Sequence, residues 1–198
     1  MLEDLSDPDR LRPGLGSDIR KNIAKAQRQG VAVECTEDID EFWRVNTATF
    51  RRQGLPMPYH LDFVRRLDEA CKARGRRRIF LTRDKAGDIH AGAYIVWDNK
   101  SAYYLMGGGD PLKRKSGAHS LVIWEAIRFA SGVAHVFDFE GSMIEPVERF
   151  FRAFGAKPCP YFAISKVSSP LGLAYRVARE AASLARNRWS LSKRRRAS

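Results

Sequence analysis

Three consecutive strand-like runs constrain the fold more than any other feature of this sequence. They cover 77–83, 89–98 and 101–108, and the short polar turns DKAGD and DNKS separate them. Turns this short join antiparallel neighbours, so the three runs predict a meander. A helical pattern over 116–132 follows, and then a strand-like run over 135–141. A single helix between two strands predicts a parallel crossover, and therefore a mixed sheet.

The rest of the chain is predicted to form helices and short strands around that sheet. Apolar residues recur at helical spacing, as at Ile39, Phe42, Trp43 and Phe50, and several such stretches end at a glycine. We therefore expect an α/β fold with a mixed, mostly antiparallel sheet flanked by helices, and an added basic helix at the C-terminus. The expected helices are 17–30, 38–54, 59–75, 144–155 and 171–189, the further strands are 31–35 and 160–167, and residues 1–16 form an irregular lead-in.

Composition narrows the classes of function. Hydrophobic residues make up 44% of the 198 residues, which is enough for a core, and no stretch reaches the roughly 18 apolar residues of a membrane span. The polar, acidic start of the chain does not resemble a secretory signal, so we expect a cytoplasmic protein. Cys35, Cys71 and Cys159 are too few and too far apart for a disulfide framework or a zinc signature, and we expect no bound metal.

The net charge of +12 favours anionic partners. More than half of the excess lies at the end of the chain, where residues 170–198 contain eight Lys and Arg and one acid, Glu180. Small apolar residues recur along one side of the helix expected there, and three alternatives remain open. This helix packs on the domain, lies on an anionic membrane surface, or contacts an RNA backbone.

A basic, glycine-rich junction connects the third meander strand to the crossover helix. It reads GGGDPLKRKSGAHS and begins at residue 107. The free N–H groups and the dipole of a helix N-terminus attract anions. Small residues there let an oxygen approach the backbone, and nearby cations pair with phosphate. The alternative is a solvated turn with a serine cap. The phosphate-binding site predicted here consists of Lys113, Arg114 and Lys115 with the backbone of Ser116, Gly117 and Ala118.

Two acids lie on the strand predicted after the crossover helix. Asp138 and Glu140 are two residues apart, so a strand would point both to one face. A charged pair near the end of a central strand is unusual in a core, and it fits a general base that assists an attacking amine. The alternative is structural, in which the acids form ion pairs with Arg149 or Arg152 of the following helix.

The order of elements, together with RKSGAH at residues 114–119, resembles the GNAT acyltransferase fold. In that family the helix after the fourth strand presents its N-terminus to the pyrophosphate of acetyl-CoA, with the motif Arg/Gln-x-x-Gly-x-Gly/Ala. Arg114 and Gly117 match this motif, and His119 stands where it has a small residue. A closer resemblance is to the FemAB-like branch of peptidyl- and aminoacyl-transferases. The stretches that carry it are 17–33, 42–54, 102–127 and 136–162.

Members of that branch usually carry two tandem GNAT-like halves, and this chain resembles the second half alone. The resemblance therefore implies a homodimer, or a partner that supplies the other half. It also implies three parts of the chain. They are a lead-in and basic helix over 1–30, a GNAT-like domain over 31–167, and an amphipathic basic helix with its tail over 168–198.

The resemblance implies transfer of an acyl or aminoacyl group to the amine of a small molecule or peptide, in cell-envelope synthesis. The donor would be acetyl-CoA, another acyl-CoA or an aminoacyl-tRNA, which makes tRNA a further expected partner. Two alternatives remain open. The first is a non-catalytic half-protein that binds RNA or protein through its basic surface. The second is a nucleotide-binding domain without transfer activity.

Several residues acquire expected roles from this resemblance. In GNAT proteins the fourth strand separates from the next one and the acyl group enters the gap, whereas without the resemblance the three glycines predict a wide turn equally well. The expected donor contacts therefore include Gly107, Gly108 and Gly109. The expected catalytic residues are Glu140 and Asp138 with a minor role for His119, and the expected substrate contacts are Tyr104 and Ser142.

Overall fold

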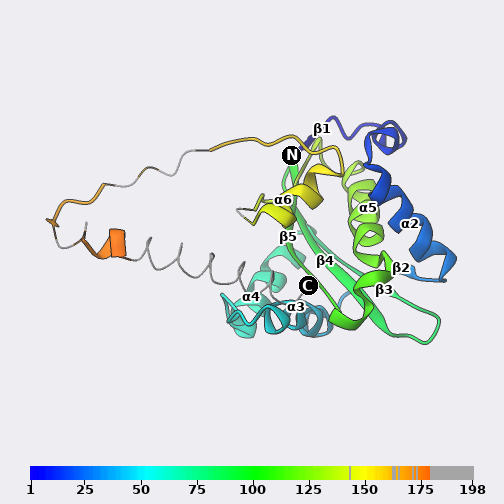
Figure 1. The fold of residues 1–198 in the computed structure, drawn as a ribbon, viewed down its shortest axis with the longest axis horizontal. Helices are drawn as coiled ribbons and strands as arrows, with labels where there is room; N and C mark the ends of the chain where they lie inside the picture. The colour runs from blue at the N-terminus through cyan, green and yellow to red at the C-terminus, as the bar shows by residue number, and fades with distance from the viewer. Residues whose placement is uncertain (143, 162–163, 165, 171, 173, 179–198) are drawn as a thin grey trace, which may run out of the picture. The chain divides into compact units, whose positions relative to one another are not determined.

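The structure is a computed structural model of the 198-residue chain (Figure 1). The chain divides into two compact units, Met1–Cys159 and Pro160–Ser198, and each is described by itself. In the second unit the backbone is helical at positions 170, 172 and 174–178. The residues that the structure describes are 1–142, 144–161, 164, 166–170, 172 and 174–178.

The first unit is built on one six-stranded sheet with the strand order β1-β6-β5-β4-β3-β2. β5 and β6 run parallel, whereas every other neighbouring pair is antiparallel. The predicted meander and the predicted parallel crossover are both confirmed. The strands are β1 (Leu2–Glu3), β2 (Ala32–Thr36), β3 (Arg77–Arg83), β4 (Ile89–Trp97), β5 (Ser101–Gly109) and β6 (Val136–Asp138).

Helices cover both faces of this sheet, as Figure 1 shows. α2 and α5 pack on one face, and α3 and α4 pack on the other. α5 forms the crossover between β5 and β6, and α6 follows β6. The α-helices are α1 (Pro8–Leu11), α2 (Ser17–Arg28), α3 (Ile39–Gln53), α4 (Leu61–Lys72), α5 (Ala118–Ala130) and α6 (Glu145–Arg152), and the 3-10 helices are η1 (Arg12–Gly14) and η2 (Pro111–Ser116).

Local sequence signals account for the ends of α3. The helix begins after Asp38, whose carboxylate accepts hydrogen bonds from the N–H groups of Asp40 and Glu41. It ends at Gly54, whose φ of +67° is a left-handed conformation that glycine adopts without side-chain strain. The helix predicted over 38–54 is therefore observed to within one residue at each end.

Alternating side chains of the meander divide the core into two layers. Leu81 and Tyr94 point to one face and pack with Phe42 of α3. Ile95 points to the other face and packs in the layer that contains Ile123 of α5. Each of these side chains is fully buried, and burial of such a side chain contributes about 1.5–3 kcal/mol. The two layers therefore hold the sheet in place from both sides.

A buried ionic network ties α4 to the sheet. Arg77 Nε lies 2.9 Å from Asp68 Oδ1, and both side chains are buried. The Tyr94 hydroxyl donates a hydrogen bond to Asp68 at 3.0 Å. Glu37 forms a second ion pair with Arg77, at 3.0 Å. Because an uncompensated buried charge is costly, these contacts fix the position of α4 on β3 and β4.

Two predicted elements at the ends of the sheet differ from the structure. Residues 1–16 are not an irregular lead-in, because β1 pairs with β6 and α1 follows it. The strand predicted over 135–141 ends at Asp138, whose carboxylate accepts a hydrogen bond from the Glu140 N–H at 2.9 Å. Glu140 and Gly141 then adopt φ values of +58° and +67°, which ends the extended conformation.

The C-terminal predictions concern the second unit. None of the described positions of the strand expected over 160–167 is in a strand. The helix expected over 171–189 lies largely outside the described residues, and so does the basic tail after it. The domain boundaries at 30/31 and 167/168 stay a prediction. Among the described residues, the helices are too short or too polar to span a bilayer.

Candidate active site

β5 and β6 separate after a short stretch of pairing. Residues 101–103 of β5 pair with 136–138 of β6, where β6 ends, and β5 continues to Gly109. The register between β4 and β5 shifts next to Tyr94 and leaves Leu105 unpaired, which is a β-bulge and bends the strand. The later part of β5 therefore has no strand beside it on this side, and we call this unpaired edge the gap between β5 and β6. This gap is the place where the resemblance puts the acyl group.

The three glycines lie within β5 and do not form the alternative wide turn. Each is needed because another group occupies the space of a side chain. A Cβ atom on Gly107 would lie 1.6 Å from the Tyr104 hydroxyl, and one on Gly108 would lie 2.7 Å from the Asn46 Cα. A Cβ atom on Gly109 would lie 2.9 Å from the His90 carbonyl oxygen. The glycines thus allow α3 and aromatic side chains to approach the backbone closely.

Two side chains of α3 bind the edge of β5 that faces the gap. The Asn46 amide donates a hydrogen bond to the Gly107 carbonyl at 2.8 Å. The Gly109 N–H donates to the Thr49 hydroxyl at 3.0 Å. Asn46 is 1% exposed, and its side-chain oxygen has no hydrogen-bond partner among the described residues.

Tyr104 and His119 form a polar pair on the α5 side of the sheet. The Tyr104 hydroxyl lies 3.5 Å from His119 Nε2, and Phe150 and Phe151 of α6 pack edge-on against the two rings. Burial, with a contribution from the nearby Arg114 charge, lowers the pKa of His119 to about 4. Burial also raises the pKa of Tyr104. At neutral pH the pair therefore consists of a neutral imidazole and a protonated phenol.

The predicted phosphate-binding backbone at the start of α5 is packed against α2. Ser116, Gly117 and Ala118 are buried. Gly117 has a φ of +83°, and a Cβ atom there would lie 2.2 Å from the Asn22 carbonyl oxygen of α2. The Ala118 N–H donates to the Ser116 hydroxyl at 3.2 Å, and Lys25 of α2 donates to the Lys115 carbonyl at 2.6 Å. The small residues of this motif therefore serve close helix packing here.

The three cations of the junction have different surroundings. Lys113 forms ion pairs with Asp84 at 3.1 Å and with Asp88 at 2.8 Å, so its charge is held by the turn between β3 and β4. Arg114 and Lys115 are exposed, and neither side chain forms an ion pair within the part of the chain that the structure describes. The phosphate-binding role predicted for Arg114 and Lys115 stays a prediction.

The two acids lie near the end of β6, where the gap begins. Asp138 is the register partner of Tyr103, so the two side chains share the face that α3 and α4 cover. Tyr104, the next residue, points to the opposite face. Glu140 lies beyond the strand, so the shared face predicted from strand alternation does not apply to it. Glu140 is exposed, and partial desolvation, followed by the Asp138 charge, raises its pKa.

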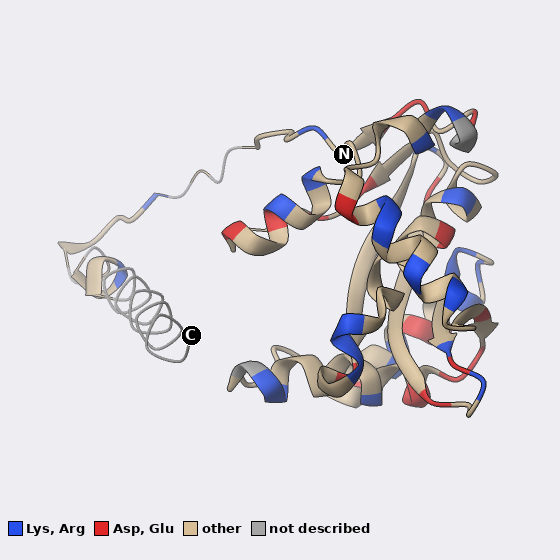
Figure 2. Ribbon diagram, turned by 45° about the vertical axis from the view of Figure 1, so that its right-hand side comes forward, with Lys and Arg blue, Asp and Glu red and all other residues tan. Residues whose placement is uncertain are grey.

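The arginines proposed as structural partners of these acids have other partners. Basic and acidic residues lie side by side along α6, as Figure 2 shows. Arg149 pairs with Glu145 at 2.8 Å, and Arg152 pairs with Glu148 at 2.7 Å. Ser142 accepts a hydrogen bond from the Ile144 N–H at 3.1 Å and so caps the approach to α6.

The gap is bordered by groups that sequence reasoning predicted and by others that it missed. Gly107, Tyr104 and His119 lie close together, and Asp138 lies on the other face of the same strands, while the roles expected of them stay a prediction. Asn46 and Thr49 were missed. The signal for them was present, because both are polar residues at helical spacing from the apolar Phe42.

No group of three or more His, Cys, Asp or Glu side chains in the described part of the chain is arranged to hold a metal ion. No curated protein matches the sequence. Among solved structures, FemX matches with a TM-score of 0.69 at 14% identity, over 77% of this chain and 57% of the FemX chain. This chain therefore spans little more than half the length of FemX.

Shorter acetyltransferases match along almost their whole length. The aminoglycoside antibiotic 6'-N-acetyltransferase from Acinetobacter baumannii matches with a TM-score of 0.54 at 12% identity, over 71% of this chain and 99% of that chain. An aminoglycoside acetyltransferase from an uncultured soil metagenomic sample matches with a TM-score of 0.52 at 14% identity, over 70% and 97%. At these identities the likeness shows a shared fold.

A match to a family profile gives stronger evidence of the family than these structural matches do. The profile of the family described as "Acetyltransferase (GNAT) domain" matches residues 16–151, which include the sheet from β2 to β6 and the junction before α5. This match covers well over half of the chain and agrees with the fold of the solved acetyltransferases. The chain belongs to the GNAT acetyltransferase domain family, whose members transfer acyl groups and use acyl-CoA.

Proposed function

We propose that this chain transfers an acyl or aminoacyl group from a thioester or ester donor to an amine, in the gap between β5 and β6. The observation that carries the proposal is the early end of β6 at Asp138, beside a β5 that is bent by a bulge and continues to Gly109. Polar groups that can act on an acyl transfer border this gap on both faces of the sheet.

Glu140 is the proposed general base. An attacking amine must lose a proton as its nitrogen forms the new bond to the acyl carbon, while the bond from that carbon to the donor sulfur or oxygen breaks. Partial desolvation and the Asp138 charge raise the pKa of Glu140, and this makes it a better proton acceptor than an ordinary carboxylate. Asp138 positions Glu140 through the hydrogen bond from its backbone N–H.

The donor is proposed to be held by the exposed cations Arg114 and Lys115. Both an acyl-CoA and an aminoacyl-tRNA carry phosphates that these side chains can pair with. An acyl-CoA arm that formed hydrogen bonds with the edge of β5 would have to displace Asn46 and Thr49. The ester end of an aminoacyl-tRNA has no such requirement, so the α3 contacts favour the ester donor. The resemblance adds a peptide amine of the cell envelope as the proposed acceptor.

A transfer assay with acetyl-CoA, longer acyl-CoAs and aminoacyl-tRNA tests this proposal. Glu140→Gln should lower the rate at least about a hundredfold, because it removes the base while keeping the size of the side chain. The matched control is Glu145→Gln on α6, which removes an exposed carboxylate that pairs with Arg149 and should leave the rate unchanged. If Glu140→Gln retained full activity with any donor, the assignment of the base would be wrong.

A second candidate function follows from the length of the chain, which spans 57% of the FemX chain. In this alternative the chain is a non-catalytic half that binds RNA or another protein through its basic surface. The absence of transfer with every donor, combined with RNA binding that weakens steeply as salt rises, would favour it over acyl transfer. Measurement of the mass in solution tests whether two copies associate to supply both halves.

A further inference from the structure

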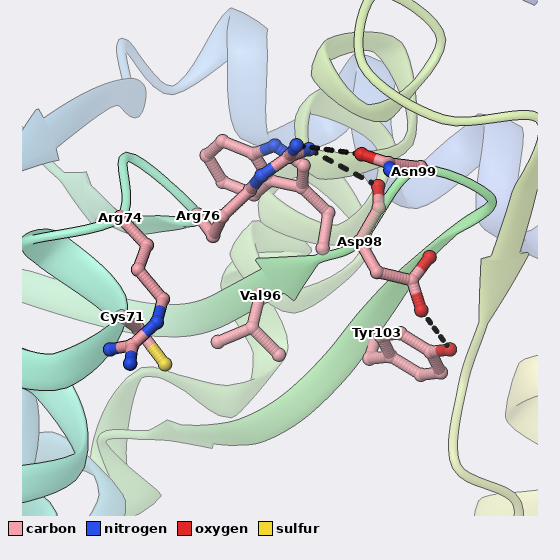
Figure 3. A pocket seen from close by; sticks show the side chains of 8 residues that line it. Cys71, Arg74, Arg76, Val96, Asp98, Asn99 and Tyr103 are labelled. Carbon is pink, nitrogen blue, oxygen red and sulfur yellow. Dashed lines mark hydrogen bonds between the residues drawn. The ribbon is translucent and has the colours of Figure 1, made fainter.

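A hollow of about 430 Å³ lies on the α4 side of the sheet, at the end where β4 turns into β5 (Figure 3). It is separate from the glycines, which lie at the opposite end of β5. The C-terminal end of α4 and the loop after it form one wall, and the turn between β4 and β5 forms the other. The lining residues are Cys71, Arg74, Arg76, Val96, Trp97, Asp98, Asn99 and Tyr103.

The floor of this hollow is largely apolar. Figure 3 shows Val96 between the side chains of Arg74 and Tyr103, with Cys71 beside Arg74. Burial raises the pKa of the Cys71 thiol, so the sulfur is uncharged at neutral pH. A ligand that fills the hollow therefore meets carbon, sulfur and an aromatic ring. These surfaces suit an apolar segment of a ligand.

The lining includes two arginines, of which Arg74 lies beside Cys71 and the apolar floor, whereas Arg76 points toward the turn between β4 and β5 (Figure 3). Arg74 donates to the Ala70 carbonyl at 2.7 Å, and Arg76 donates to the Asn99 side chain at 2.7 Å. Neither arginine forms an ion pair with any acid in the described part of the chain. Arg76 also donates to the Asp98 carbonyl at 3.4 Å, whereas Arg74 keeps further N–H groups available, and a guanidinium binds a planar carboxylate well.

The acid in the lining does not neutralise these arginines. Asp98 accepts hydrogen bonds from the N–H groups of Lys100 and Ser101, both at 2.7 Å, and from the Tyr103 hydroxyl at 2.9 Å. Its oxygens are therefore engaged within the turn and with Tyr103. The hollow keeps an excess of one positive charge over an apolar surface.

We propose that this hollow binds the acceptor substrate through an apolar segment that ends in a carboxylate, with Arg74 holding the carboxylate. The role of the ligand as acceptor rests on the proposed acyl transfer. The binding site itself is inferred from the hollow alone. Tyr103 links the hollow to the proposed active site, because its register partner on the neighbouring strand is Asp138. Neighbouring strands lie about 4.8 Å apart, so a ligand in the hollow can extend its amine toward the two acids.

Binding is tested first, without any reaction. Calorimetric titration should detect octanoate, whereas octanol, which lacks the charge, and acetate, which lacks the apolar body, should each bind at least about fivefold more weakly. Arg74→Gln should weaken octanoate binding about fivefold. Added salt should weaken it as well. The control is Arg66→Gln, an exposed arginine of α4 outside the hollow.

The outcomes of the binding arm are separate from the proposed activity. Octanoate binding that Arg74→Gln weakens and Arg66→Gln does not would support the site. Failure of the wild-type protein to bind octanoate, or equal binding by all three proteins, would overturn it. This arm decides the site even if no amine is ever acylated.

The transfer arm tests the role of the ligand as acceptor. In an active preparation, 6-aminohexanoate should give a kcat/KM at least about fivefold above that of hexylamine, and Arg74→Gln should remove this preference. Equal use of both amines by an active enzyme would overturn the acceptor role. A complete lack of transfer would instead count against the proposed function, and the titration would still decide whether the hollow binds a carboxylate.

Discussion

Lowering the pH from 7 to 5 should destabilise the folded protein by about 2 kcal/mol through one side chain, His119. The pKa of His119 is about 4 in the folded protein, because burial and the Arg114 charge disfavour the imidazolium. In the unfolded chain the imidazole returns to an ordinary pKa near 6.5. Between these two values the unfolded state binds a proton that the folded state does not, so stability falls as the pH falls.

The size of the effect follows from the two pKa values. Well above pH 6.5 neither state is protonated, and the contribution of His119 is fully present. Well below pH 4 both states are protonated, and the whole difference of about 3 kcal/mol has been lost. About 2 kcal/mol of this difference is lost by pH 5, where most carboxylates are still ionised.

Urea denaturation, followed by tryptophan fluorescence at pH 7 and pH 5 and constant ionic strength, measures this loss. His119→Gln removes the titrating group but keeps a polar partner for the Tyr104 hydroxyl. The free-energy difference between this variant and the wild type should therefore shrink by about 2 kcal/mol on going to pH 5. His60→Gln, a change at an exposed position before α4, should keep the pH dependence of the wild type.

The reasoning would be refuted if His119→Gln lost as much stability between pH 7 and pH 5 as the wild type. A direct check is the NMR titration of the His119 imidazole in the folded protein, for which we expect a midpoint near pH 4. A midpoint near 6.5 would mean that the side chain is solvated in the folded state, and that the Tyr104 pair does not exclude water.

Three further substitutions test the packing around the site. Asp68→Asn should cost about 3 kcal/mol in urea denaturation, because it leaves a buried arginine without its main partner, whereas Asp62→Asn on the exposed side of the same helix should not move the midpoint. Gly87→Ala, at a φ of +87° with open space around it, should lower the free energy of unfolding by about 1 kcal/mol. Gly117→Ala should lower it by at least about 2 kcal/mol more, because the new Cβ would collide with an α2 carbonyl. Equal costs at the two glycines would mean that α2 does not pack on the junction. Asn46→Ala should cost about 1–3 kcal/mol and expose the edge of β5 to solvent, which faster hydrogen exchange at Gly109 would report.

Much of the fold could be predicted from local patterns in the sequence. Period-two alternation between short polar turns identified β3, β4 and β5, since turns of that length leave antiparallel pairing as the available geometry. A single helix before the next strand then required a parallel crossover. The helix ends at Gly54 and near Gly30 followed from the tolerance of glycine for left-handed backbone. None of these inferences depends on contacts between distant residues.

The candidate site was predicted less completely, and the misses have physical causes. Strand alternation placed Glu140 on a strand face, but the Asp138 side chain competes for its backbone N–H and ends the strand first. Similarly, the motif at Ser116–Ala118 was interpreted through its small side chains. Small side chains permit the approach of an oxygen from any source, and here a carbonyl of α2 approaches Gly117.

The sequence by itself determined most of the helices and strands between residues 17 and 155, how the meander runs, and the family to which the chain belongs. The tertiary structure alone decided which groups meet at the gap. Asn46 reaches the edge of β5, α2 covers the start of α5, and Lys113 turns to Asp84 and Asp88. The physical reason is that hydrophobic periodicity specifies which face of an element is buried, whereas the partner that covers it depends on how all the elements pack together.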